Sequence, residues 1–306
     1  MKIYGAGIAG LLAGCQFQQA RIYEAAPENT QQHKAVLRFR SSAVGDAVGI
    51  DFRKVKVHKG LWLDGKAVAP SIQLANWYSR KVIGKLADRS IWNLAPAERF
   101  IAPEDFIGQL IDRCHGRIEW NRPITAADIE QEKEPIVSTL PMNIMVKLIQ
   151  QLDPTGAPSA PPEPFEYAPI TVRRWRVPGA DVFQSIYFPS LGTNLYRASI
   201  TGDLLIAEYA GTADDSEDEM FEAFGLVEDD CVPIEKVSQR YGKIAPIDEA
   251  WRKRFIFQLT HSYEIFSLGR FATWRNLLLD DVIKDVSVVK KLINTSSYER
   301  MRANVK

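Results

Sequence analysis

The chain has 306 residues, 46% of them hydrophobic, and its 38 acidic and 38 basic residues give a net charge of zero. This length is enough for one large or two modest domains with a substantial core. Three distant cysteines, four scattered histidines and the lack of an apolar run of about 18 residues argue against a disulfide framework, a metal site and a membrane span.

The first 24 residues have the order strand, glycine turn, helix, strand, acid. Residues 2–4 and 21–23 predict two short strands, and a glycine-rich turn and a helix lie between them. In a dinucleotide-binding unit, Gly5 would make the tight turn, Gly7 would let the backbone approach a pyrophosphate, and Gly10 would pack the helix on the strand. The pyrophosphate would sit on the helix N-terminus. We expect a nucleotide at Gly5, Gly7, Ile8, Ala9, Gly10 and Glu24.

Glu24 narrows the choice of nucleotide. Its carboxylate is placed to accept hydrogen bonds from a ribose 2′-hydroxyl and would repel a 2′-phosphate, which disfavours NADP. A turn without a ligand is the alternative, but strand, helix, second strand and acid occur together here. Because the unit starts at residue 2, we expect no targeting peptide and a cytoplasmic location, in a host cell if the protein is phage-encoded.

Residues 36–40 alternate like a strand and carry Arg38 and Arg40. These two arginines are candidates to hold the pyrophosphate, and an ordinary basic edge strand is the alternative. Residues 50–68 contain short alternating runs broken by Asp64-Gly65, which predicts a hairpin in an inserted antiparallel sheet.

The block of residues 53–89 carries nine Lys or Arg against two Asp, a local charge of +7. Such blocks are usually solvated faces. Because Trp62, Trp77 and Tyr78 lie among these bases, the block also suits an anionic partner with stackable rings, and DNA is a candidate partner.

Residues 135–141 predict a buried strand that ends in small hydroxyl residues and a proline, followed by a helix over residues 142–152. Ligands of a doubly wound sheet lie beyond the carboxyl ends of its strands, so Ser138, Thr139 and Pro141 would face the cofactor. The proline-rich stretch 153–169 is expected to link to a second domain of strands. Candidate substrate-binding residues on those strands are Arg173, Arg176, Tyr187, Tyr196 and Arg197.

Residues 265–268 predict a strand, residues 269–276 a second glycine turn, and residues from 277 onward a helix with Asp280 and Asp281 near its start. The second turn gives the fold another positive helix end, which suits the electron-rich side of a flavin. A nicotinamide enzyme has no need of it, so FAD is the expected cofactor. The cofactor candidates in this turn are Gly269, Arg270, Trp274, Arg275 and Asn276.

Taken together, these motifs resemble the flavoprotein group that contains UDP-galactopyranose mutase and the flavin amine oxidases. The similarity rests on the first glycine turn with Glu24, residues 138–141, 187–189 with 196–197, 241–246, and the turn at 269–275. The resemblance implies FAD and an inserted substrate domain. Residues 78–106 are also similar to small phage-encoded flavoproteins, some of which are associated with thymidine hypermodification.

The expected fold class is α/β, a Rossmann-like FAD-binding domain with an inserted antiparallel β-sheet substrate domain. The predicted FAD-binding domain comprises residues 1–50, 95–152 and 255–306, and the substrate domain residues 51–94 and 165–250. Three functions stay open: a FAD-dependent oxidoreductase or lyase that oxidises a C–N bond of an amine, for example glycyl-modified thymidine in phage DNA; a mutase-like sugar-nucleotide isomerase that uses reduced FAD; and a non-catalytic binding protein.

Overall fold

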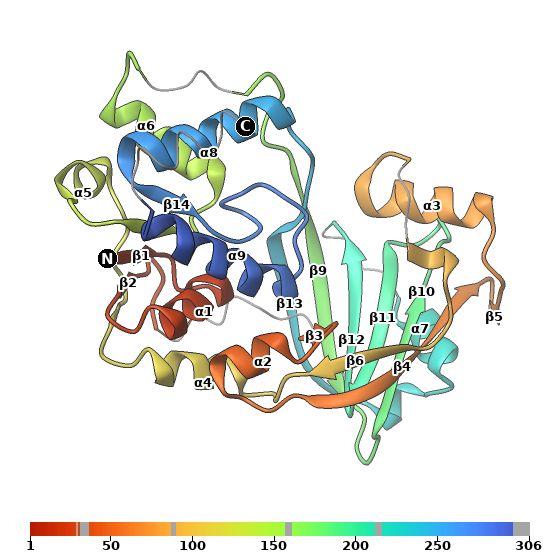
Figure 1. Cartoon of the computed structure of the whole chain (residues 1–306). Coiled ribbons are helices and arrows are strands. Elements are labelled where there is room, and N and C mark those ends of the chain that lie inside the picture. Colours follow the sequence, from red (N-terminus) through yellow and green to blue (C-terminus); the bar gives the residue numbers. More distant parts are fainter. Residues whose placement is uncertain (29, 31–36, 87–89, 157–160, 212–215, 296–306) are drawn as a thin grey trace.

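The protein is represented by a computed structural model, which describes residues 1–28, 30, 37–86, 90–156, 161–211 and 216–295. Over these residues the chain folds into a five-stranded parallel sheet between helices and a larger, curled sheet beside it (Figure 1). The predicted α/β fold class is confirmed.

The five-stranded sheet has the order β14-β8-β1-β2-β7, and every pair in it is parallel. Its strands are β1 (Lys2–Tyr4), β2 (Arg21–Tyr23), β7 (Ile118–Glu119), β8 (Ile136–Ser138) and β14 (Ile265–Ser267). Four of them, β1, β2, β8 and β14, were predicted from short apolar runs that end in glycine, acid or hydroxyl residues. Parallel pairing places their carboxyl ends at one edge, where β1, β8 and β14 lead into the glycine turns and the hydroxyl residues.

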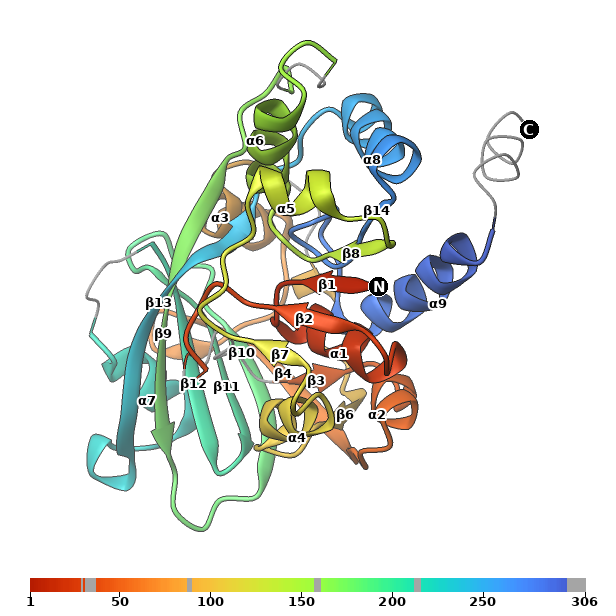
Figure 2. The same ribbon diagram turned by 90° about the vertical axis from the view of Figure 1, so that its left-hand side faces the viewer.

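Helices cover both faces of this sheet, as Figure 2 shows from the side. One face packs against α1 (Ile8–Gln16), α2 (Ala43–Val48), α4 (Phe106–Arg113) and α9 (Leu279–Ile293), and the other against α5 (Ala126–Gln131), α6 (Met142–Leu152) and α8 (Glu249–Tyr263). Burial on both faces explains why the strands are apolar without alternation.

The nine-stranded sheet has the order β13-β9-β12-β11-β10-β4-β6-β3, and β5 pairs with β4. Its strands are β3 (Arg38–Phe39), β4 (Arg53–Leu63), β5 (Lys66–Ala67), β6 (Ala97–Ile101), β9 (Tyr167–Arg176), β10 (Val182–Tyr187), β11 (Leu195–Gly202), β12 (Leu204–Ala210) and β13 (Val232–Ile244). The pairs are antiparallel except β4 with β10, which is parallel. Asp64 and Gly65, both with positive φ, make the predicted turn between β4 and β5.

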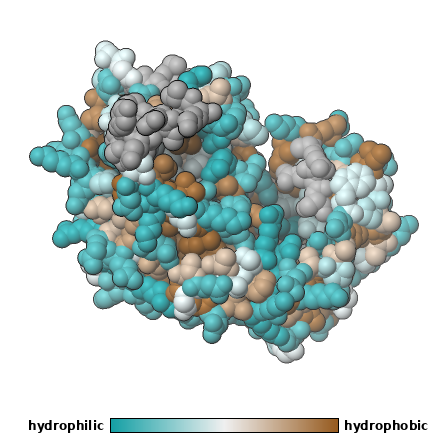
Figure 3. Space-filling view, viewed as in Figure 1, coloured by the Kyte–Doolittle hydropathy of each residue, from teal (hydrophilic) through white to brown (hydrophobic). Residues whose placement is uncertain are grey.

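Two helices cover opposite faces of the nine-stranded sheet (Figures 1 and 2). Tyr78 and Val82 of α3 (Ile72–Ile83) pack with Tyr196 and Ile206, whereas Met220 and Phe221 of α7 (Asp218–Phe224) pack with Leu205. Short 3₁₀ helices occur at Ser90–Trp92 and Glu228–Asp230. The molecular surface is indented between the parts formed by α8 and α9 and the part formed by α3 (Figure 3).

None of the described helices has the length and apolar character that a membrane crossing requires. Within the same described ranges, no group of three or more His, Cys, Asp or Glu side chains is arranged to hold a metal ion.

Candidate functional site

The first glycine turn leaves no space for side chains at two of its glycines. Gly5 has a φ of +97°, and a Cβ there would lie 2.4 Å from Thr139 Oγ1. A Cβ at Gly10 would lie 1.9 Å from the carbonyl oxygen of Gly5, so α1 crosses the turn in direct backbone contact. Gly7 is the N-cap of α1, and no side chain caps this end. The first N–H groups of α1 therefore have no side-chain acceptor at this cap, which is the arrangement of helix ends that bind anions.

The other predicted segments surround this turn. Thr139 Oγ1 donates to the carbonyl oxygen of Tyr4 at 2.9 Å, which ties the end of β8 to the end of β1. Gly269, with a φ of +88°, follows β14, and a Cβ there would lie 2.8 Å from Cβ of Ala9. Ser138 Oγ is buried and has no hydrogen-bond partner among the described residues. The turns after β1, β8 and β14 thus form a single cradle of small residues at one sheet edge.

Glu24 is buried beside the cradle. Its Oε2 accepts a hydrogen bond from the backbone N–H of Ala6 at 2.7 Å, and its Oε1 accepts one from Ala26 at 2.9 Å. Each carboxylate oxygen keeps a second lone pair, so Glu24 both fixes the turn and retains acceptor capacity for a ribose hydroxyl.

Arg38 and Arg40 lie in different surroundings. The guanidinium of Arg38 bonds to the nine-stranded sheet, with Nη1 donating to Ser185 Oγ at 2.6 Å and Nε to Thr201 Oγ1 at 2.9 Å. Arg40 is exposed, and its backbone N–H donates to Asp280 at the start of α9 at 2.9 Å. Arg38 therefore faces the sheet, whereas the backbone of Arg40 connects the β3–α2 loop to α9.

A β-bulge between Leu195 and Arg197 brings two predicted substrate residues together. Arg197 is opposite both Tyr187 and Glu208, and Nη2 of Arg197 lies 2.8 Å from Oε1 of Glu208. Because of the bulge, the side chains of Tyr196 and Arg197 lie on the same side of the sheet. There the ring of Tyr196 packs edge-on to Tyr78, and Nζ of Lys243 lies 4.9 Å from the centre of the Tyr196 ring. Bulges re-aim side chains in this way.

The charged side chains of Arg38, Arg197 and Glu208 shift one another's pKa values. Burial by itself would raise the pKa of Glu208, but the charge of Arg197, followed by those of Lys243 and Arg38, lowers it. Burial and the neighbouring Arg197 lower the pKa of Arg38 to about 10, so its guanidinium stays charged at neutral pH. Burial would also lower the pKa of Arg197, and the carboxylate of Glu208 outweighs this effect and raises it well above its usual value.

Arg270 extends the group toward the cradle. It follows Gly269 in the chain, its Nη2 donates to the carbonyl oxygen of Gly242 at 3.4 Å, and its Nε is buried without a hydrogen-bond partner among the described residues. Burial lowers the pKa of Arg270, and the nearby Tyr196 acts against this shift. We call Arg38, Arg197, Lys243 and Arg270, together with Glu208, the cationic cluster. It has four basic side chains and one acidic side chain.

Arg173 and Arg176 are not part of this cluster. Arg173 is paired with Glu217, and Arg176 is paired with Glu104 and, at 2.6 Å, with Asp203. Each of these guanidinium groups already has a carboxylate partner away from the cationic cluster, so their assignment to the substrate stays a prediction.

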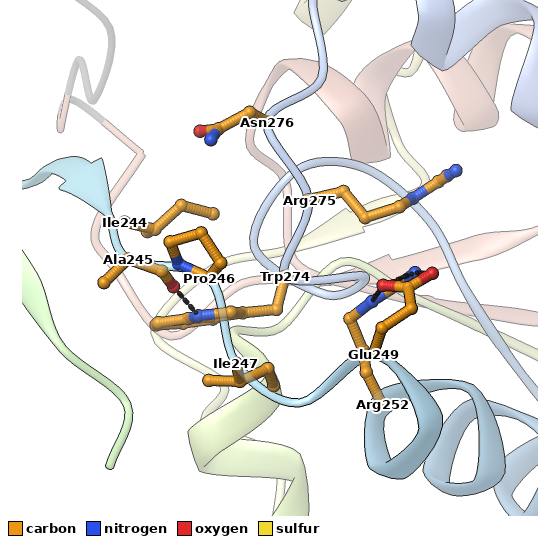
Figure 4. Close-up of a pocket in the computed structure, with 9 residues that line it drawn as sticks. All are labelled: Ile244, Ala245, Pro246, Ile247, Glu249, Arg252, Trp274, Arg275 and Asn276. Carbon is orange, nitrogen blue, oxygen red and sulfur yellow. Dashed lines mark hydrogen bonds and ion pairs between the residues drawn. The ribbon is translucent and has the colours of Figure 1, made fainter. Parts of the chain in front are cut away.

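A pocket of about 260 Å³ lies beside the second glycine turn (Figure 4). It is lined by Ile244, Ala245, Pro246, Ile247, Glu249, Arg252, Trp274, Arg275 and Asn276. Trp274 has a φ of +46°, which is rare for a residue with a Cβ, and its Nε1 donates to the carbonyl oxygen of Ala245 at 2.9 Å. The structure thus gathers three predicted cofactor residues, Trp274 to Asn276, at one pocket.

Pro141, the N-cap of α6, also lies close to the second glycine turn. The backbone N–H of the next residue, Met142, donates to the carbonyl oxygen of Phe271 in that turn.

Several functional candidates were missing from the sequence prediction. Glu208 lies in the apolar strand β12, and an acid in such a strand could have signalled a buried ion pair. Lys243 and Arg252 have no such local signal, because they meet their neighbours only through the pairing of β13 and the packing of α8.

Comparison with protein-family models gives no match, and comparison with curated proteins gives none either. Solved structures do match. The crystal structure of reduced UDP-galactopyranose mutase is 14% identical, with a TM-score of 0.65 over 97% of this chain and 94% of that one. The chain shares its fold. Two further structures match across most of their length: p-nitrophenol 4-monooxygenase from Pseudomonas putida (12% identity, TM-score 0.55, 97% and 81% covered) and an oxidoreductase from Methanosarcina mazei (9%, 0.52, 95% and 100%).

Proposed function

We propose that the protein binds FAD in the cradle. The residues fit this cofactor: Gly5, Gly10 and Gly269 have no room for a Cβ, so the turns that carry them pack closely together, and the N-terminal end of α1 faces the cradle that they form. Glu24 would accept from the adenosine ribose, and the orphaned hydroxyl of Ser138 offers a donor and an acceptor nearby. The turn from Gly269 to Asn276 and the start of α9 would receive the flavin end.

We infer that the substrate carries an anionic group. The observation that supports this most strongly is Arg270 of the cationic cluster, whose Nε is buried without a hydrogen-bond partner among the described residues. Buried charge is costly unless it is paired. A carboxylate or phosphate on the substrate would accept a hydrogen bond from this Nε and balance the charge of Arg270.

The reaction we propose is the oxidation of a C–N bond in an amine with a carboxylate, such as an N-substituted glycine. Bound FAD would supply the two-electron oxidation of the carbon between nitrogen and carboxylate. Water then adds to the substrate imine, the C–N bond breaks, and the products are the primary amine and glyoxylate. In total, one water would be consumed, bound FAD would take up the two hydrogens removed from the substrate, and an electron acceptor such as dioxygen would complete the balance.

The chain's own residues prepare the substrate for this step. The cationic cluster binds the carboxylate and at the same time disfavours a second positive charge, which keeps the amine unprotonated and its lone pair available. Tyr187, half-buried and packed edge-on with Tyr78, would form a wall that orients the substrate and excludes water, and the buried Tyr196 also packs on Tyr78.

The test uses FAD-loaded protein mixed without oxygen with N-benzylglycine. We expect the visible flavin absorbance to bleach and one glyoxylate to form per flavin. N-Methylbenzylamine, which lacks the carboxylate, should react at least tenfold more slowly, and Arg270→Met should remove most of this preference. Flavin that stays oxidised with all N-substituted glycines would rule out this reaction.

A mutase-type isomerisation with reduced FAD is the second candidate. The match to the mutase structure over 94% of its length favours it, and a sugar diphosphate would also neutralise the cationic cluster. Conversion of UDP-galactopyranose that requires reduced flavin and transfers no net electrons would select this function. A protein that binds the nucleotide and converts neither substrate would be the third, non-catalytic candidate.

We also propose that the amine is presented on DNA, as in glycyl-modified thymidine, with the basic block 53–89 as the contact surface. Arg53 and Lys54 are paired with Asp181 and Glu98, and Lys81 donates to backbone carbonyls. Besides these two exposed ion pairs, the exposed bases of the block are Lys56, Lys66, Arg80 and Lys85, and Arg89 lies outside the described residues. Retention on a DNA oligonucleotide should weaken with salt and fall further in Arg80→Ser/Lys85→Ser. Retention that ignores both changes would exclude this surface.

A further inference from the structure

Two cysteines that are far apart in the sequence meet where α1 packs against α4 (Figure 2). Cys15 lies in the last turn of α1, and Cys114 is the C-cap of α4. The Sγ of Cys114 donates to the carbonyl oxygen of Leu11 at 3.8 Å, and a Cβ at Gly14 would lie 2.9 Å from this sulfur. A helical carbonyl points toward the residue four positions on, so Cys114 faces the side of α1 that carries Cys15. The two thiols share a hydrogen bond.

The backbone on both sides of the thiol pair is held in place by Arg117. Its Nη1 donates to the carbonyl oxygen of Gly14 at 3.1 Å, and its Nη2 donates to that of Arg113 at 3.0 Å. The first of these residues precedes Cys15 in α1, and the second precedes Cys114 at the end of α4. The two sulfurs are therefore held near each other in the folded chain.

The surroundings of the pair favour a thiolate. The hydrogen bond that Cys15 donates lowers the pKa of Cys114, against the effect of burial, and the charge of Arg117 lowers it further. The same hydrogen bond, followed by burial, raises the pKa of Cys15, whereas the charges of Arg113 and Arg117 act against this shift. Because the sulfurs share one proton, the negative charge can lie on either of them. Cys15 is half-buried and Cys114 is buried, so Cys15 is the sulfur that a small oxidant reaches first.

Cys231 has different surroundings and serves as an internal control. It lies in the apolar cluster of the nine-stranded sheet with Trp175 and Phe221, and burial raises its pKa. The other two cysteines lie on α1 and α4, at the parallel sheet. A buried thiol of this kind is inert, in contrast to the pair.

We propose that Cys15 and Cys114 form a redox-active dithiol, which a peroxide such as hydrogen peroxide converts into a disulfide. One thiolate attacks hydrogen peroxide, the O–O bond breaks, and a sulfenic acid and one water form. The second thiol then attacks the sulfenic sulfur, the S–S bond forms, and a second water leaves. The two sulfurs lose two electrons in total, which the peroxide oxygens take up. A thiol reductant reverses the change by exchange.

The disulfide would join the end of α1 to the end of α4. Because the N-terminal end of α1 faces the cradle, oxidation would fix the position of the helix that carries part of the candidate site. Transfer of two hydrogens to dioxygen gives hydrogen peroxide, so an oxidase of the kind proposed above would be one source of the oxidant. The dithiol would respond to peroxide from any source, and its chemistry is independent of the proposed function.

The experiment treats purified, folded protein with a small excess of hydrogen peroxide, removes the peroxide, and counts free thiols after unfolding. We expect the three free thiols of the reduced chain to fall to one, and a peptide map to show Cys15 linked to Cys114 with the loss of two hydrogens. The link closes a loop of about 100 residues, so the midpoint of thermal unfolding should rise by about 5–10 °C and should fall back after treatment with dithiothreitol.

Two alanine substitutions separate the pair from the third cysteine. Cys15→Ala should lose both the linked peptide and the rise in the unfolding midpoint. Cys231→Ala is the matched control and should keep both. If either variant does not fold, the peptide map of the wild type decides, because it identifies the two sulfurs directly.

A folded wild type that keeps three free thiols in peroxide would overturn the proposal. Oxygen added to single cysteines without a linked peptide, or a link through Cys231 or between two chains, would overturn it as well. A linked chain whose unfolding midpoint does not rise would contradict the fixing of α1 against α4.

Discussion

At the scale of single residues, Gly10 and Gly108 make a matched pair for testing the cradle. A Cβ at Gly10 would lie 1.9 Å from the carbonyl oxygen of Gly5, whereas one at Gly108, in α4, meets nothing within 4 Å. We predict that Gly10→Ala destabilises the protein by about 1–3 kcal/mol through overpacking, and that Gly108→Ala stabilises it by roughly 0.4–1 kcal/mol. Urea unfolding measures both. Equal effects of the two substitutions would show that α1 does not press on the turn.

The Arg197–Glu208 pair provides the second prediction for single residues. Glu208 has a side chain that is 6% exposed, so Arg197→Met leaves a buried carboxylate short of its main partner. We expect a loss near the lower end of roughly 3–5 kcal/mol, because Lys243 and Arg38 still lie near Glu208. The double variant Arg197→Met/Glu208→Leu should recover at least half of this loss in a double-mutant cycle. Additive losses would mean that the two side chains are not coupled.

At the scale of elements, local sequence signals predicted the bounds of a helix and the place of a turn. They did not predict which strands pair with one another. Helix α6 begins and ends at the predicted residues, 142 and 152, and the Asp64-Gly65 turn lies between β4 and β5. The pattern Ser216-Glu217-Asp218-Glu219 predicts a capping box that opens a short helix. The helix is present, but this box is wrong, because the N-cap of α7 is Glu217 and no side chain caps it. The parallel pairing of β4 with β10 joins residues more than 100 positions apart, and no local pattern specifies it.

Helix α5 supplies a prediction on pH. Its N-cap Thr125 and Asp128 form a capping box, and Arg122 contacts the same carboxylate. Burial would raise the pKa of Asp128, but the hydrogen bonds from Arg122 and Thr125 outweigh it and hold the pKa at about 2. The pKa is lower in the folded than in the unfolded chain, so the stabilisation is present above about pH 4 and is lost as the pH falls toward about 2.

The corresponding measurement compares the wild type with Asp128→Asn across this range. The difference in their free energies of unfolding should be largest above about pH 4 and should shrink toward about pH 2. A difference that stays constant with pH would show that the carboxylate charge has no part in holding the start of α5.

At the scale of the whole molecule, the candidate site joins segments from the entire chain. The cradle could be predicted because its glycines, hydroxyls and acid each follow a strand of the parallel sheet. The cationic cluster could not, because Arg38, Arg197, Glu208, Lys243 and Arg270 come from five separate segments, and only the curl of the nine-stranded sheet against the parallel sheet brings them together. The pocket likewise depends on how α8 meets the second glycine turn.

The most direct measurement is the titration of purified protein with FAD, followed by its visible spectrum. We predict one FAD bound per chain, with the shifted absorbance of an oxidised flavin in a protein site. The Gly10→Ala variant should lose most of this binding if it remains folded, and Gly108→Ala should keep all of it. A folded wild-type protein that shows no spectral change at any FAD concentration, or a Gly10→Ala variant that binds FAD as the wild type does, would contradict the proposed cradle.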